Sequence, residues 1–314
     1  MSIGGASRDA LIAASERAFA EMERIERLFT DWHSGSAVWE LNERAGGAPV
    51  PVPEEVIELL AESVAVSRET GGAFDVTYRT VGRFWSFTEG SERVATDDEI
   101  AAALPHVGFE KIHIDRAAGT VALADRETQI GLGGVAKGYA VDRAVQVLES
   151  LGVTDGVVDA GGDMRVFRTS ASSAAPARIG IRHPDRADST LATIQVCNAS
   201  IHTSGDYEHE FERDGVRYHH ILDPRSGRPA RGMRAVTLVV AADGTRGDAL
   251  TKGLFVMGAE RAIEWVDAHP ETAALVMAPD GTIFTSRRWN ALTRPPAPAD
   301  GGGGEIVGIS GCAG

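Results

Sequence analysis

The stretch around which this chain is organised is GLGGVAKGYAVD, residues 131–142. Its four glycines and one lysine lie where a short apolar segment changes to a helical pattern that runs to about Leu151, with Gly152 as a C-cap. Small residues let a ligand approach the backbone, and the free N–H groups at a helix start attract anions. The pattern predicts a strand, a glycine-rich turn and a helix, with a phosphate-bearing ligand as the first hypothesis. A tight turn without a ligand is the alternative, because the stretch matches neither the phosphate-loop nor the dinucleotide motif.

Composition narrows the class of protein. The 314 residues can form one large domain or two closely packed ones. A net charge of −14 argues against nucleic acid or an anionic membrane surface as the main partner. The only cysteines, Cys197 and Cys312, rule out a framework of several disulfides and a thiolate metal cluster.

Hydropathy also bears on location. No apolar run reaches the length of about 18 residues that a spanning helix needs, and the N-terminal residues have no basic region followed by an apolar core. We therefore expect no membrane-spanning segment and a cytoplasmic protein. A trimmed form of an exported, periplasmic protein would have the same sequence, so this alternative stays open.

Helical periodicity marks further segments outside the glycine-rich stretch. An apolar face with spacings of three and four predicts a helix from about Leu11 to Phe29. Pro53 suits the first position of a helix that ends near Arg68. Another helix is expected to begin at Asp248, since an acidic residue is favourable at the positive end of the helix dipole.

Strand patterns and turn residues account for much of the chain after Val107. Strands are expected at 111–115, 119–123, 128–132, 156–166, 178–182, 190–196, 207–222 and 234–241. Residues 156–166 contain a Gly-Gly turn bracketed by Asp159 and Asp163, and 207–222 contains a hairpin turn at Asp214-Gly215. We expect one domain over residues 1–293 and a disordered Pro- and Gly-rich tail over 294–314.

Several polar residues have both a structural and a functional interpretation. His219 and His220 are adjacent on a predicted strand, so only one can face a given pocket. Asp75 follows a Gly-Gly turn and either caps backbone N–H groups or faces a ligand. Asp248 is a helix cap or a metal ligand, and Lys137 is a surface charge or a phosphate contact. The residues alone predict a ligand-binding α/β protein with a phosphate site.

Five motifs together resemble the ApbE family of FAD:protein FMN transferases in order and spacing. They are residues 132–142, 160–163, 203–208, 219–227 and 248–250, and the similarity runs from about Glu21 to Thr285. The resemblance implies an α+β fold related to the tunnelling fold, with mixed sheets packed with helices. It also implies that FAD is bound with a divalent metal, usually Mg²⁺, and that its FMN half is moved to a Thr or Ser hydroxyl of an acceptor protein, with release of AMP.

The resemblance further implies roles for individual residues. Gly134 matches the position whose carbonyl reaches the metal, Asp248 matches the metal-ligating acid, and Thr251 matches another position of the metal loop. His220 matches the proposed general base. The positions that match FAD contacts are Lys137, Phe74, Asp75 and either Ile221 or Leu222. A neutral imidazole could take the acceptor's proton while a metal and a lysine offset the diphosphate charge.

The chain also departs from the family pattern. Lys252 stands four residues after Asp248, where a Thr is common, and its ammonium could occupy the metal's space or point away from it. Gly131 replaces a usual acid, and His202 stands where a small residue is frequent. The family's opening strand, with its Met-Gly-Thr flavin contact, has no expected counterpart. An FAD pyrophosphatase that yields FMN and AMP, and a non-catalytic FAD-binding protein, therefore stay open as alternatives.

Overall fold

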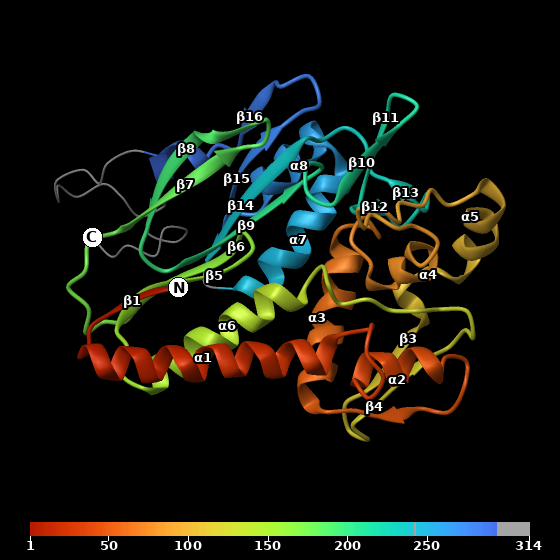
Figure 1. Cartoon of the computed structure of the whole chain (residues 1–314), viewed down its shortest axis with the longest axis horizontal. Helices are drawn as coiled ribbons and strands as arrows, with labels where there is room; N and C mark the ends of the chain where they lie inside the picture. Colours follow the sequence, from red (N-terminus) through yellow and green to blue (C-terminus); the bar gives the residue numbers. More distant parts are fainter. Residues whose placement is uncertain (242, 294–314) are drawn as a thin grey trace.

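A computed structural model describes residues 1–241 and 243–293. The expected tail, 294–314, lies outside the described residues. Within them, seven strands form one antiparallel sheet in the order β1-β5-β6-β9-β14-β15-β16 (Figure 1). Their bounds are β1 Ser2–Gly4, β5 Asp155–Ala160, β6 Asp163–Arg168, β9 Ala199–Gly205, β14 Ala235–Ala241, β15 Thr272–Met277 and β16 Ile283–Thr285.

Strand β1 corrects one expectation. The chain does have an opening strand, because Ser2–Gly4 pairs with β5 at the edge of the sheet. Three residues are too few for a recognisable alternation of apolar and polar side chains, so the pattern could not be read from the sequence.

Three helices pack against one face of the sheet. Helix α6 (Ala136–Ser150) contacts β5 and β6, α7 (Gly244–Met257) contacts β9 and β14, and α8 (Ala259–Ala268) contacts β15. The long helix α1 (Arg8–Phe29) lies along α6, and α3 (Glu54–Glu69) packs against α7 (Figure 1). The helix after the glycine-rich turn is therefore held between α1 and the sheet.

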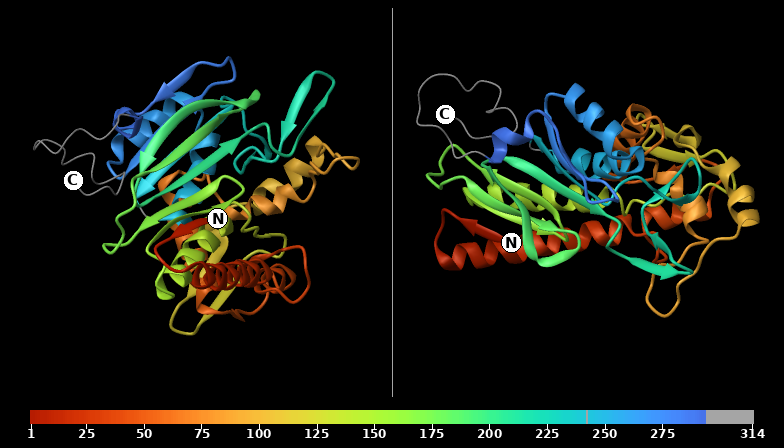
Figure 2. Two further views of the ribbon diagram at one scale, coloured as in Figure 1. Left: turned by 60° about the vertical axis from the view of Figure 1, so that its left-hand side comes forward. Right: turned by 90° about the horizontal axis from the view of Figure 1, so that it is seen from above.

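The opposite face of the sheet is covered by the hairpin of β7 (Ala177–His183) and β8 (Arg186–Val196) and by α9 (Trp289–Thr293), as Figure 2 helps to show. Alternation along β14 decides which side chain faces which layer. Leu238 and Val240 belong to the core on the helix side, whereas Val239 belongs to the core beneath the hairpin.

The remaining elements lie to one side of the large sheet (Figure 1). The helical ones are α2 (Ala37–Glu43), η1 (Val76–Tyr78), α4 (Arg79–Gly82), α5 (Asp97–Ala103), η2 (Leu104–His106) and η3 (Phe109–Lys111). The strands are β2 (Val50–Pro51), β3 (Ile112–Asp115), β4 (Thr120–Leu123), β10 (Glu210–Arg213), β11 (Val216–His219), β12 (Leu222–Asp223) and β13 (Arg228–Pro229). The predicted hairpin turn is confirmed, since Asp214 and Gly215 have φ of 54° and 72° between β10 and β11.

The segment before the glycine-rich turn is not the strand expected at 128–132. The Asn42 side chain accepts a hydrogen bond from the Ile130 N–H at 2.8 Å and donates one to the Ile130 carbonyl at 2.9 Å. The Gly131 N–H donates to the Val76 carbonyl at 2.9 Å. A distant side chain and the start of η1 thus satisfy backbone groups that a neighbouring strand would otherwise satisfy.

Candidate active site

Two buried carboxylates form the centre of a charged cluster between the sheet and the helices. Asp163 begins β6 and lies directly opposite His202 on β9. Asp248 and Lys252 come from successive turns of α7, and Lys137 comes from the first turn of α6. The side chains of Asp163, His202 and Asp248 are each 0% exposed.

The cluster is joined by direct polar contacts. The His202 Nδ1 lies 2.8 Å from the Asp163 Oδ1, and the Lys137 ammonium contacts the Asp163 Oδ2. The Lys252 ammonium contacts the Asp248 Oδ1 and lies 3.9 Å from the Asp163 Oδ1. The Gly138 N–H donates to the Asp248 Oδ2 at 2.9 Å.

These contacts determine the charge states of Asp163 and Lys252. Burial by itself would raise the pKa of Asp163, but the charge of Lys252 and the hydrogen bond from His202 hold that pKa well below its usual range. Burial would likewise lower the pKa of Lys252, yet Asp163 and Asp248 raise it above the ordinary value. Asp163 and Lys252 are therefore both ionised at neutral pH. Because the Asp163 carboxylate only accepts, the His202 Nδ1 carries the hydrogen, and its Nε2 has no hydrogen-bond partner among the described residues.

Glycines let the two helices and the sheet approach closely. A Cβ on Gly138 would lie 2.1 Å from the Gly244 carbonyl oxygen and 2.7 Å from the Asp248 Cβ. A Cβ on Gly247 would lie 2.4 Å from the His202 Cδ2. No real side chain fits at such distances, so these glycines bring α6, α7 and β9 into the contact that forms the cluster.

The expected start of a helix at Asp248 is wrong. Helix α7 begins at Gly244, and Asp243 is its N-cap, accepting a hydrogen bond from the Arg246 N–H at 2.9 Å. Asp243 has the favoured cap chemistry one turn earlier, and the glycines that follow do not interrupt the helix. Asp248 instead accepts from a backbone N–H in the first turn of α6.

Two other predicted residues lie next to the cluster. Gly134 lies against the Lys252 stem and the Phe74 ring, since a Cβ there would be 3.8 Å from the Lys252 Cγ and 3.5 Å from the Phe74 Cε2. Thr251 is fully buried in α7, and its hydroxyl donates to the Asp248 carbonyl at 2.8 Å. The structure thus brings the Lys252 stem of α7 against the glycine-rich turn, whereas the Thr251 hydroxyl is hydrogen-bonded within α7.

Asp75 makes the contacts of a loop cap. Its carboxylate accepts from the Thr77 N–H at 2.8 Å, the Thr77 hydroxyl at 2.7 Å and the Phe109 N–H at 2.7 Å. Ile221 and Leu222 are both buried, but in different apolar cores: Ile221 in the large core with α7, and Leu222 in a smaller core with Trp85. Their roles at a flavin nucleotide stay predictions.

The adjacent histidines differ in environment, but they are not both on a strand, because β11 ends at His219 and His220 follows in a bend. His219 is buried, its Nε2 donates to the Ala230 carbonyl at 2.9 Å, and its ring packs edge-on against Phe255. His220 is partly exposed, and its Nδ1 donates to the Glu208 carbonyl at 2.8 Å. Burial lowers the pKa of each imidazole to about 4, against the smaller opposing effect of these hydrogen bonds. Both rings are therefore neutral at pH 7.

Asp163 and His202 were not assigned to the site by sequence. The signals were present, because Asp163 follows a Gly-Gly turn within a matched motif and His202 is an unusual residue for its position. What was missing is the pairing of β6 with β9, which joins residues 39 positions apart.

The cluster offers the donor types of a divalent-cation site, but its carboxylate oxygens are already engaged. Asp163, His202 and Asp248 can each direct a ligand atom to within 4.8 Å of the others. Each of the four carboxylate oxygens, however, already contacts an ammonium, an imidazole N–H or a backbone N–H. With Lys252 in this position, the arrangement does not fit a divalent ion.

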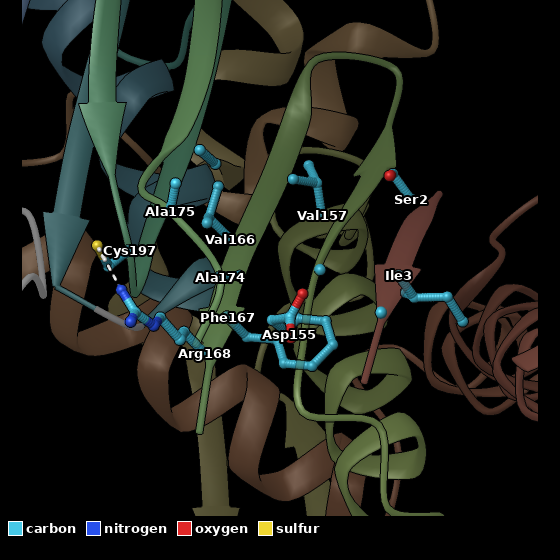
Figure 3. Close-up of a pocket in the computed structure, with 13 residues that line it drawn as sticks. Ser2, Ile3, Asp155, Val157, Val166, Phe167, Arg168, Ala174, Ala175 and Cys197 are labelled. Atoms are coloured by element: carbon cyan, nitrogen blue, oxygen red, sulfur yellow. Dashed lines mark hydrogen bonds between the residues drawn. The ribbon is translucent and has the colours of Figure 1, made fainter. Parts of the chain in front are cut away.

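Two cavities lie away from the cluster. One, of about 220 Å³ at the edge of the sheet, is lined by residues such as Ser2, Asp155, Phe167 and Arg168 (Figure 3). A second cavity, of about 210 Å³, is lined in part by Asp75, Phe109 and Arg225. Neither contains a cluster residue, and we assign the chemistry to the cluster because reactive and charged groups converge there. Among the described helices, none is long and apolar enough to cross a membrane.

The fold and the cluster define an α+β protein in which a glycine-rich helix start lies beside buried, paired charges. The sequence model of the ApbE family matches residues 3–276, and the chain belongs to this family. The FAD:protein FMN transferase of Treponema pallidum is 32% identical over 87% of this chain and 79% of its own length. The enzyme of the same name from Klebsiella pneumoniae is 29% identical over 77% of this chain and 71% of its own.

Solved structures agree with this assignment. The ApbE protein of Thermotoga maritima has a TM-score of 0.84 and 34% identity, covering 90% of this chain and 92% of its own. The flavinyl transferase ApbE of Pseudomonas stutzeri, in its apo form, has a TM-score of 0.78 and 28% identity, covering 93% and 91%. The expected α+β fold of the ApbE type is confirmed.

Proposed function

We propose that this protein is an FAD:protein FMN transferase. The acceptor hydroxyl oxygen forms a bond to the phosphorus of the FMN half, the diphosphate P–O bond breaks, and AMP leaves. Family membership supports this reaction, and the observation in the site that carries it is the state of His220. Its Nδ1 hydrogen is committed to the Glu208 carbonyl, and its pKa of about 4 leaves Nε2 as a free base at neutral pH.

Other residues have supporting roles in this proposal. Lys137 is 45% exposed, so its ammonium can approach a diphosphate while it also contacts Asp163. Phe74 and Asp75 are assigned to the FAD side, with Ile221 and Leu222 beside the nucleotide. The acceptor is a protein with an accessible Thr or Ser. The Mg²⁺ expected beside Gly134, Asp248 and Thr251 stays a prediction, and the contact of Lys252 with Asp248 argues against it. The cytoplasmic location also stays a prediction.

The test is a transfer assay with the purified protein, FAD and an acceptor domain that carries a flavinylation Thr, run in MgCl₂ and in EDTA. A fluorescent acceptor band together with equimolar AMP supports the proposal. AMP and FMN without a labelled acceptor would identify the pyrophosphatase instead. Retention of FAD by the protein in EDTA, with neither product in either condition, would identify a non-catalytic FAD-binding protein. A control acceptor with the Thr replaced by Ala should stay unlabelled.

A further inference from the structure

Lys252 lies where two buried carboxylates would share a cation. Helix α7 places it one turn after Asp248, on the same face of the helix. Its ammonium contacts the Asp248 Oδ1 and is 3.9 Å from the Asp163 Oδ1, and its side chain is only 18% exposed. The Lys252 stem runs past Gly134, and a Cβ at that position would lie 3.8 Å from the Lys252 Cγ.

The remaining contacts complete the neutralisation of the two carboxylates, Asp163 and Asp248. The second oxygen of Asp163 contacts the Lys137 ammonium, and the second oxygen of Asp248 accepts from the Gly138 N–H. The two carboxylates carry two negative charges and the two ammonium groups two positive charges, so the sum is zero. A divalent ion at this point would have to displace the Lys252 ammonium, and the group would then carry one excess positive charge.

We propose that the Lys252 ammonium is the resident cation of this site, in place of a divalent metal ion. It holds Asp163 and Asp248 together and offsets their negative charge beside the ligand diphosphate. An ammonium is a compact charge with three donors, and a covalently tethered one cannot be removed by a chelator. The statement about the cation stands on geometry alone, whereas the statement about the diphosphate rests on the proposed function.

The direct test is a Mn²⁺ titration of the full chain, followed through the electron paramagnetic resonance signal of free Mn²⁺. Wild type should show no stoichiometric binding. Lys252→Thr removes the ammonium and makes room between the carboxylates, so it should bind one Mn²⁺ per chain, at least about tenfold more tightly than wild type. Lys137→Ala is the matched control, because it also removes one ammonium charge from the cluster but leaves Lys252 in place. It should behave as wild type.

Two results of this titration would overturn the proposal. One is a single tightly bound Mn²⁺ in wild type, and the other is a folded Lys252→Thr protein that binds Mn²⁺ no better than wild type. Circular dichroism establishes whether the variant is folded.

A second measurement uses only the wild-type protein. It therefore tests whether a metal ion is the resident cation even if Lys252→Thr does not fold. Quenching of flavin fluorescence should give the same Kd for FAD in EDTA and in excess MgCl₂. A gain of about tenfold or more with MgCl₂ would show that a metal ion is the resident cation. Failure to bind FAD in both conditions would contradict the proposed function, and the wild-type Mn²⁺ titration would then decide the cation on its own.

Discussion

At the scale of single residues, two neighbouring histidines have opposite tautomers. His219 uses its Nε2 hydrogen to bind the Ala230 carbonyl inside the core, and His220 uses its Nδ1 hydrogen to bind the Glu208 carbonyl near the surface. The same residue type therefore has a structural role at one position and a chemical one at the next. The choice is made by the backbone carbonyl that each ring meets.

His220→Ala should lower kcat for FMN transfer by a factor of about 10² to 10⁴, because it removes the proposed proton acceptor. FAD affinity should change little. In wild type, kcat should be level from neutral pH downward until the imidazole protonates near its pKa of about 4. The matched control is His209→Ala, whose ring lies 5.4 Å from that of His220 without the carbonyl contact to Glu208. Full activity of His220→Ala would refute the assignment of the base.

At the scale of elements, the contact between α6 and α7 builds the cluster. Gly138 faces the Gly244 carbonyl and the Asp248 side chain, and Gly244 in turn lies against Asp142. The glycine-rich stretch was first interpreted as a phosphate-binding turn. Its fourth glycine has a packing function in addition, since it lets the helix carrying Asp248 reach the first turn of α6.

Gly138→Ala should destabilise the protein by about 1–3 kcal/mol, because the added methyl group forces α6 and α7 apart. Urea unfolding measures this change. Gly133→Ala is the control: a Cβ there has no heavy atom within 4 Å apart from its chain neighbours, so it should leave the free energy of unfolding nearly unchanged. Equal stability of the two variants would show that the helices can separate without cost.

At the scale of the whole molecule, buried neutral histidine links folding to pH. The pKa of His219 is about 4 in the folded protein, below the ordinary value of 6.5. Between these values the unfolded chain binds a proton that the folded chain does not. The stabilisation is thus complete above about pH 6.5 and is lost as the pH falls through 4.

The free energy of unfolding should accordingly fall on acidification, with up to roughly 3 kcal/mol of the loss due to His219. His219→Gln keeps a donor for the Ala230 carbonyl but does not titrate, so its unfolding free energy should depend less on pH than that of wild type. The exposed His113→Gln should keep the wild-type dependence. Urea unfolding at several pH values between about 7 and 4 distinguishes them, and parallel curves for His219→Gln and wild type would contradict the argument.

How well the sequence predicted a feature depended on how far apart in the chain its interacting residues lie. The Gly-Gly turn before Asp163, the hairpin at Asp214-Gly215 and the Gly152 cap were all predicted, since each depends on residues close in the chain. The segment 128–132 was predicted wrongly because its backbone partner is the side chain of Asn42, 88 residues away from Ile130. Local patterns contain no information about such a partner.

The sequence by itself determined most helices and strands, the ApbE resemblance and the pair of candidate residues Lys137 and Asp248. It also identified Lys252 as a departure from the ApbE pattern, whose ammonium could either occupy the metal's space or point away from it. Only the tertiary structure decided between them, by placing the Lys252 ammonium on Asp248 and bringing Asp163 to within 3.9 Å of it. The reason is physical. Periodicity reports which face of an element is buried, whereas the position of a charged side chain depends on which distant strands and helices pack beside it.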